Sequence, residues 1–286
     1  MEIVGYSYSF GPITGPRPID NARAIHWFHE RGITSLELYD PWMEDEDEVL
    51  RVEDAIAATG MKVLMCDVNC HVGFRDAGER AAGTDRFHER LRVAARLGAG
   101  SILILPSMPG WDSDLTADEL REWLYEAVEN SMRVARELGL ILLVANLGFR
   151  GDVYGGPEWV IDACERLGDQ VRTVYDVGNF VMAGYDPVAA LDRVFPYTHH
   201  VHVKDWTPLD AELPGASWKG TRDGPWFKAV DLGEGVVPLP AAVQRLRELG
   251  YDGTVSPEYE GPEQPYAVMD RAITYTREAF KGTENE

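Results

Sequence analysis

The sequence predicts a single (β/α)8 barrel, and three observations support this class. Six helix-like segments end at a glycine that a β-rich run follows at once. Strands alternate with helices along the chain, which implies a parallel sheet. The 286 residues suffice for eight such units, and no linker or change of composition divides them. We therefore expect one barrel domain over residues 1–286 rather than an open doubly wound sheet.

The helix-ending glycines mark most of the strand starts. Glycine readily adopts the left-handed conformation that closes a helix, so we expect a strand after each of Gly32, Gly60, Gly98, Gly139, Gly168 and Gly250. An opening strand near residues 2–8 and another at 198–204 complete the set of eight. We expect no such backbone constraint at Gly215, which lies in a long segment after the seventh strand.

Helix starts carry ordinary signals. Thr116 and Glu119 have the spacing of a capping box, and the dipeptide Asp186-Pro187 is typical of a first helical turn, as is Pro240. The segment from 206 to 235 shows no helix or strand period and is rich in glycine, proline and tryptophan. Its aromatic residues argue against disorder, so we expect a long functional loop there.

Charge and cysteine content exclude several classes of protein. The chain has 27 basic and 48 acidic residues, and its net charge of -21 repels nucleic acid and anionic membranes. It shows no run of about 18 apolar residues and no basic, apolar start typical of a signal peptide. The three cysteines form no C-x-x-C pair, which fits a reduced, cytoplasmic protein.

The seventh strand carries the strongest functional signal. Alternation puts His200, His202 and Lys204 on one face and the two intervening valines on the other. Two imidazoles and an ammonium are costly to bury without partners, so we favour a functional site over purely structural histidines. In a barrel of this class the site lies at the carboxyl ends of the strands.

Three consecutive strand ends carry a potential set of metal ligands. Asp176, His202 and Glu258 end the sixth, seventh and eighth strands, and we expect them to converge above the barrel. Two carboxylates and an imidazole suit a divalent cation such as magnesium, manganese, cobalt or zinc.

Four motifs in order resemble the xylose isomerase-like TIM barrel superfamily of sugar isomerases and epimerases. They are Asp176-Val177-Gly178-Asn179, His202-Val203-Lys204-Asp205, Gly233-Glu234-Gly235 and Glu258. The resemblance covers nearly the whole chain. It implies that Asp176, His202 and Glu258 hold the metal, with manganese as first choice, and that Glu258 is also an acid or base. It further implies that Lys204, as a catalytic group, and Arg222 face substrate oxygens.

The remaining candidates are weaker individually. Glu37, in Leu36-Glu37-Leu38, fits the family pattern and is expected at the substrate, as is Tyr8 near the end of the first strand. His71 is either an acid or base at the barrel mouth or a hydrogen-bonded loop residue. Trp111 either stacks on a sugar face or covers the rim.

One position departs from the family. Where the resemblance implies a glutamate after the fifth strand, this chain has Ala145, followed by the expected Asn146. In the family that glutamate is a fourth metal ligand and one of two bases. Either the chain is a natural variant whose reaction needs a single base, or the glutamate has been replaced to trap a complex.

The resemblance implies a metal-dependent isomerase or epimerase that moves a proton next to the carbonyl of a keto-sugar or related polyol. The alternative is a lyase, of the inosose dehydratase type or one that cleaves 3-oxo-glycosides with a small partner subunit. A non-catalytic sugar-binding protein and an apurinic-site endonuclease are more remote, the latter because of the acidic charge. We expect an unphosphorylated small-molecule substrate, since no Gly-rich phosphate loop occurs. We expect the protein to form a homo-oligomer or a complex with a small partner subunit.

Overall fold

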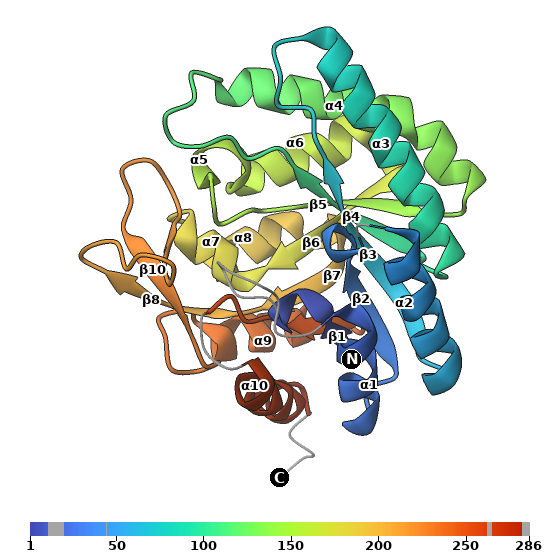
Figure 1. Cartoon of the computed structure of the whole chain (residues 1–286). Helices are drawn as coiled ribbons and strands as arrows, with labels where there is room; N and C mark the ends of the chain where they lie inside the picture. The colour runs from blue at the N-terminus through green and yellow to red at the C-terminus, as the bar shows by residue number, and fades with distance from the viewer. Residues whose placement is uncertain (11–19, 44, 262–264, 282–286) are drawn as a thin grey trace.

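Eight parallel strands close into a barrel in the order β1-β11-β7-β6-β5-β4-β3-β2 (Figure 1). This computed structural model describes residues 1–10, 20–43, 45–261 and 265–281. The predicted (β/α)8 fold is thereby confirmed. The barrel strands are β1 (Glu2–Tyr6), β2 (Ser35–Tyr39), β3 (Lys62–Cys70), β4 (Ser101–Pro106), β5 (Ile141–Ala145), β6 (Val171–Asp176), β7 (Thr198–Val203) and β11 (Thr254–Pro257).

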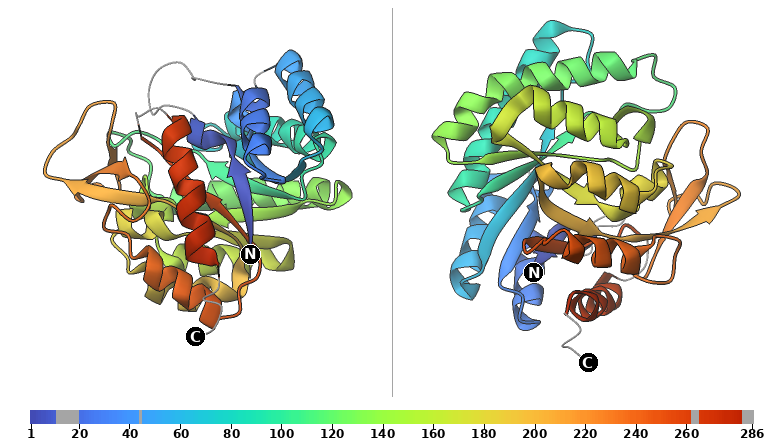
Figure 2. Two further views of the ribbon diagram at one scale, coloured as in Figure 1. Left: turned by 90° about the horizontal axis from the view of Figure 1, so that it is seen from below. Right: turned by 180° about the vertical axis from the view of Figure 1, so that it is seen from behind.

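Helices surround the barrel between successive strands (Figures 1 and 2). The long ones are α1 (Asn21–Glu30), α2 (Glu46–Thr59), α3 (Ala77–Arg96), α4 (Ala117–Glu137), α6 (Pro157–Leu167), α8 (Pro187–Val194), α9 (Leu239–Glu248) and α10 (Pro265–Phe280). Two short ones, α5 (Gly151–Tyr154) and α7 (Val177–Met182), lie above the strand ends. None of the described helices is long and apolar enough to cross a bilayer.

The predicted helix boundaries are confirmed. One expectation about a glycine outside the helices is wrong. Thr116 and Glu119 form a complete capping box at the start of α4. All six predicted helix-ending glycines have φ between 69° and 90°. Gly215, expected to be unconstrained, also has a φ of 70°, so that expectation is wrong. A tight turn needs the left-handed conformation as much as a helix end does.

Two apolar regions stabilise the barrel. The larger lies between strands and helices and receives Val201 and Val203 of β7, whereas His200 and His202 are buried on the inner face. A smaller cluster fills part of the barrel interior and consists of Met65, Leu103, Leu143, Ala145 and Val174. All three cysteines are buried and free.

The segment after β7 is a small antiparallel sheet rather than an irregular loop. Its strands β8 (Asp205–Leu209), β9 (Trp218–Lys219) and β10 (Trp226–Val230) pair in the order β8-β10-β9. This sheet projects from the side of the barrel in each of the views (Figures 1 and 2). Trp206 and Phe227 are buried and anchor it. The strands have only two to five residues, Pro208 lies within β8, and glycine and proline fill the turns between them, which hides their period in the sequence.

Candidate active site

Asp176, His202 and Glu258 meet at the carboxyl ends of β6, β7 and β11. One ligand atom from each side chain lies within 4.8 Å of the others, and all three residues are buried. The Nδ1 atom of His202 is 3.1 Å from Oε2 of Glu258 and 3.8 Å from Oδ2 of Asp176. The convergence predicted from the strand ends is therefore present in the structure.

The Asp176 carboxylate is fixed by the chain around it. Asp176 is the N-cap of α7, and its Oδ1 accepts the backbone N–H of Asn179 at 2.9 Å. Asn146, at the end of β5, donates its side-chain amide to the carbonyl of Asp176 and accepts that residue's N–H. Oδ1 is thus occupied, and Oδ2 is the atom that faces His202 and Lys204.

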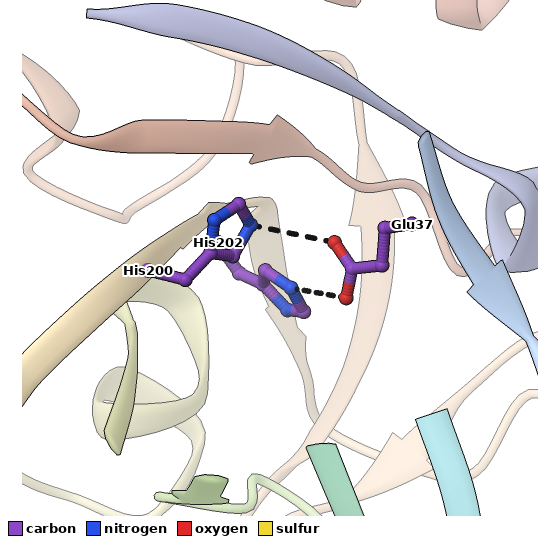
Figure 3. A group of neighbouring side chains, drawn as sticks. All are labelled: Glu37, His200 and His202. Carbon is purple, nitrogen blue, oxygen red and sulfur yellow. Dashed lines mark hydrogen bonds and ion pairs between the residues drawn. The ribbon is translucent and has the colours of Figure 1, made fainter. Parts of the chain in front are cut away.

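Glu37 contacts the imidazole of His202 through the ring nitrogen that does not face the two carboxylates. Nε2 of His202 lies 2.8 Å from Oε1 of Glu37, while Nε2 of His200 lies 3.3 Å from the other oxygen (Figure 3). Burial opposes ionisation of Glu37, but His202 and His200 outweigh it and hold its pKa well below the ordinary value. Because Nε2 is engaged by Glu37, Nδ1 is the nitrogen that faces the two carboxylates.

His200 belongs to the same cluster but has its own partners. Its Nδ1 pairs with the hydroxyl of Thr254 at 2.6 Å and its Nε2 with that of Ser256 at 2.9 Å. Burial lowers the pKa of His200, which favours the neutral ring. Glu37, His200 and His202 could also surround a cation by distance alone. The hydroxyl partners make a supporting role the better interpretation.

The donor set fits a divalent cation. Oε2 of Glu258 is buried, and its contact among the described residues is Nδ1 of His202 at 3.1 Å, without the alignment of a regular hydrogen bond. A buried carboxylate oxygen needs a well-aligned partner, and a metal ion between this oxygen and the imidazole nitrogen would satisfy both atoms. Nδ1 of His202 and Oδ2 of Asp176 are the other two atoms that such an ion would contact.

Lys204 links the carboxylates of this site. Its Nζ is 3.0 Å from Oδ2 of Asp176, 2.8 Å from Oε1 of Glu258 and 2.6 Å from Oε1 of Glu260. The ammonium is almost fully buried, and burial lowers its pKa, but the three carboxylates raise it well above the ordinary value. Gly178 allows this placement, because a Cβ there would lie 2.4 Å from Cγ of Lys204.

The two glutamates after β11 differ in acidity. Burial raises the pKa of Glu258, but Lys204 and His202 outweigh it and lower the value to about 2. Burial raises the pKa of Glu260 to about 7, and Lys204 offsets this only in part. The site thus contains one carboxylate that stays ionised and one that can take up a proton near neutral pH.

The cavity above these groups has walls of different character. The polar side chains that line it are Tyr6, Tyr8, Tyr39, Asn69, Asp176, Asn179, His202, Lys204, Glu258 and Glu260. Side chains from β4, β5 and the segments after them are apolar: Leu103, Leu105, Met108, Ala145, Leu147 and Phe149. Trp218, from the small sheet, completes the rim and donates its indole N–H to the carbonyl of Glu260.

The residues predicted from sequence fall into two groups. Tyr8 lies in the cavity wall, and its hydroxyl is 3.3 Å from Oε2 of Glu260. Trp111 lies beside the rim, with its ring 5.5 Å from that of Phe149. His71 and Arg222 are exposed and do not line the cavity.

Two assignments need adjustment. Glu37 is fully buried, does not line the cavity and contacts the imidazole of His202, so the structure favours a supporting position over the predicted one at the substrate. Glu260 was missed, although it stands two positions after Glu258 and therefore on the same side of an extended segment. That spacing was the only signal in the sequence that could have identified it.

Comparison with known proteins agrees with this architecture. Residues 25–279 match the family described as xylose isomerase-like TIM barrel. The chain belongs to this family. A relative in Escherichia coli strain K12, SgbU, to which L-ribulose-5-phosphate 3-epimerase activity is provisionally assigned, is 26% identical over 211 residues, which are 70% of this chain and 67% of that protein.

Two solved structures show the same barrel. The IolI protein with a bound zinc atom superposes with a TM-score of 0.77 at 15% identity and covers 98% of both chains. The 3-keto-D-glucoside 4-epimerase YcjR from E. coli gives 0.71 at 16% identity, covering 97% of this chain and 99% of its own. At these identities the likeness establishes the fold.

Ala145 is where this member of the xylose isomerase-like family departs from the expected pattern. It ends β5, lines the cavity and is only 6% exposed. It packs with Leu103 and Val174 in the interior cluster, so its surroundings are apolar on the barrel side as well. The neighbouring Asn146 keeps its structural role at Asp176.

Proposed function

We propose that this protein is a divalent-metal-dependent isomerase or epimerase that moves a proton next to the carbonyl of a keto-sugar or related polyol. The convergence of Asp176, His202 and Glu258, whose ligand atoms lie within 4.8 Å of one another in the wall of a cavity, is the observation that carries the proposal. The epimerase names of SgbU and YcjR support the reaction class.

Asp176, His202 and Glu258 would hold the cation. When bound, it would polarise the carbonyl oxygen and lower the pKa of the neighbouring C–H. Two carboxylates and one imidazole suit manganese, which we place first, with magnesium, cobalt and zinc as alternatives. The zinc in the IolI structure supports a cation in a barrel of this kind.

Proton movement falls to the groups beside that centre. Glu258 and Glu260 both face the cavity, and Glu260 has a pKa of about 7, because burial raises it, which suits a residue that accepts and returns a proton. The Lys204 ammonium, held between the carboxylates, would donate hydrogen bonds to substrate oxygens and stabilise negative charge that develops there. Tyr8 would orient the substrate from the same side.

A second candidate function follows from the position of the carboxylates. Those in the cavity wall, Asp176, Glu258 and Glu260, come from β6 and from the end of β11 onward, and the β4 and β5 wall has none among the described residues. A reaction that needs a base on only one face of the substrate, such as β-elimination, fits this arrangement. A metal-dependent lyase is therefore the alternative to the isomerase.

Solvent exchange tests the proposal. The manganese-loaded protein, incubated in heavy water with a panel of ketohexoses, an inosose and a 3-oxo-glucoside, should place deuterium at the carbon next to the carbonyl of at least one, as read by NMR. Glu258→Gln should abolish the exchange, and Glu89→Gln, on the exposed surface of α3, should not. Absence of exchange on every compound, with metal content verified, would overturn the proposal.

The setting of the reaction is part of the same proposal. Three buried free cysteines support a reducing compartment, and we propose the cytoplasm. We also propose that the protein acts as a homo-oligomer or with a small partner subunit, which light scattering of the purified protein would test.

A further inference from the structure

We propose that the substrate is amphipathic: a polyol, which carries the reacting carbonyl, joined to an aryl or alkyl group. The apolar group would lie against the wall formed by Leu103, Leu105, Met108, Ala145, Leu147 and Phe149, called here the apolar wall. The inference rests on the proposed function for the polar end of the substrate, and it adds the chemistry of the other end.

The barrel order separates the two ends in space. In the closed ring of eight strands, β4 is diametrically opposite β11, and β5 is opposite β1. Leu103 and Leu105 on β4 therefore face Glu258 across the mouth, and Ala145 on β5 faces Tyr6. A ligand whose oxygens contact Asp176, His202 and Glu258 would present its far end to the apolar wall.

The wall does not suit a free sugar. A sugar has a hydroxyl on almost every carbon, and each hydroxyl buried against leucine or phenylalanine loses its bonds to water without replacement. The same surface gains from an apolar substituent, because contact removes apolar area from water on both sides. The described residues of β4 and β5 that line the cavity are all apolar, and the polar side chains that border them are the amides of Asn69 on β3 and Asn179 on α7.

Aromatic rings continue the apolar wall outward. The ring of Phe149 lies 5.5 Å from that of Trp111 and 6.2 Å from that of Trp218, both nearly edge-on. Phe149 and Trp218 line the cavity, and Trp111 lies next to Phe149 outside that lining. Trp218 is tied to the carbonyl of Glu260, so this aromatic border is held in place beside the polar centre.

Ala145 is part of the same surface. It belongs to the interior cluster with Met65, Leu103, Leu143 and Val174, and so continues the apolar wall into the barrel. A glutamate at this position would place a carboxylate within that surface. The apolar character of position 145 is therefore consistent with its neighbours and need not be explained by the loss of a ligand alone.

Matched ligand pairs test the inference. Dissociation constants would be measured by calorimetry, on the full chain loaded with manganese, for methyl and phenyl β-D-glucopyranoside, β-D-galactopyranoside and β-D-xylopyranoside. These glycosides have no carbonyl and report binding only. In at least one series the phenyl glycoside should bind roughly tenfold or more tightly than the methyl glycoside, as expected for a ring buried on an apolar surface.

Variants show whether the preference arises at the apolar wall. Leu105→Asn should reduce the phenyl-to-methyl ratio to within about threefold and leave binding of the methyl glycoside nearly unchanged, because an amide next to the ring removes the apolar contact. Leu147→Asn serves as a second variant if the first does not fold. Leu50→Asn, at a leucine that is 46% exposed on α2, is the matched control and should keep the full ratio.

The binding and exchange experiments test the amphipathic substrate and the proposed reaction separately. If no phenyl glycoside binds more tightly than its methyl partner, or if Leu105→Asn leaves the preference intact, the inference is overturned. If the preference is present but no deuterium exchange occurs on any carbonyl compound, the amphipathic site stands and the proposed reaction fails. Exchange without the preference would retain the reaction and remove the apolar substituent.

Discussion

Nε2 of His202 lies 2.8 Å from Oε1 of Glu37, and this pair decides which nitrogen of the imidazole faces the candidate metal site. Glu37 is on β2 and His202 on β7, with β1 and β11 between them, so the closed barrel alone brings them together. Nδ1 is left to face Glu258 and Asp176.

We predict that Glu37→Gln weakens manganese binding by roughly 10- to 100-fold, the usual effect of removing an anionic partner behind a ligating histidine. Competition with a fluorescent chelator would measure it. The control is Glu89→Gln, the same substitution at an exposed glutamate on α3. Unchanged affinity in Glu37→Gln would mean that Glu37 does not orient the ligand.

A substitution at position 145 should strengthen manganese binding, whereas Glu37→Gln should weaken it. Ala145→Glu adds a carboxylate at the end of β5, next to the strand that carries Asp176. We expect affinity for manganese to rise about tenfold or more, because a further anionic ligand contributes more than a supporting contact does. Ala145→Gln has the same length without the charge and should gain much less. Equal affinities after dialysis against a weak chelator would contradict this expectation.

Asp205 explains why the H-x-K-D motif and the later G-x-G motif occur together. Its carboxylate accepts the backbone N–H groups of Gly233 and Gly235 at 2.9 Å and that of Val237 at 3.0 Å. Gly235 must lack a side chain, since a Cβ would lie 2.2 Å from Oδ1 of Asp205. The carboxylate of Asp205 thus holds residues 233–237, the segment that follows the small sheet.

We predict that Asp205→Asn destabilises the fold by about 1–3 kcal/mol, because the backbone N–H groups of Gly233, Gly235 and the buried Val237 lose their carboxylate acceptor. Hydrogen exchange should accelerate at the amides of residues 233–237 more than elsewhere. Asp210→Asn, at an exposed position on the same sheet segment, should change neither quantity. Uniform exchange in Asp205→Asn would show that the carboxylate does not hold this loop.

Helix ends give a prediction about stability alone. Gly139 has a φ of 73°, and a Cβ there would meet nothing within 4 Å, so any cost of Gly139→Val comes from the backbone. We expect a loss of about 1–2 kcal/mol in the free energy of unfolding, measured with urea. Gly100→Val is the control, since its φ is not positive and its Cβ would meet only a carbonyl oxygen at 3.8 Å. Equal losses would refute the backbone explanation.

The features that the sequence could predict depend on residues that are close together in the chain. A glycine after a helix, a capping box at Thr116, and the alternation of His200 and His202 with valines each depend on neighbours in the chain, and the structure has all of them. The strand ends follow from the barrel rule, so Asp176, His202 and Glu258 could be grouped from the sequence alone.

Contacts between distant strands could not be predicted in this way. Glu37 was expected at the substrate, because a sequence shows that a carboxylate points inward but not what lies across the barrel. Arg222 and His71 follow strands and yet are exposed, since the course of a loop depends on packing that no short pattern encodes. The segregation of the cavity into polar and apolar walls likewise needs the order of strands around the ring.

The last prediction separates the two candidate reactions. Epimerisation with inversion is served best by an acid or base on each face of the reacting carbon, and the β4 and β5 wall of this chain carries no carboxylate among the described residues. Under saturating manganese, which removes the effect of metal affinity, Ala145→Glu should therefore accelerate epimerisation at least ~10²-fold if a second base is needed, the low end of what a general base contributes. Ala145→Gln should give no acceleration. Initial rates of product formation and of deuterium uptake, measured together by NMR, would report proton transfer on the two faces of the reacting carbon. If the chain with Ala145 is already fully active and Ala145→Glu adds nothing, a group on the β6 to β11 side moves the proton alone, and β-elimination becomes the better assignment.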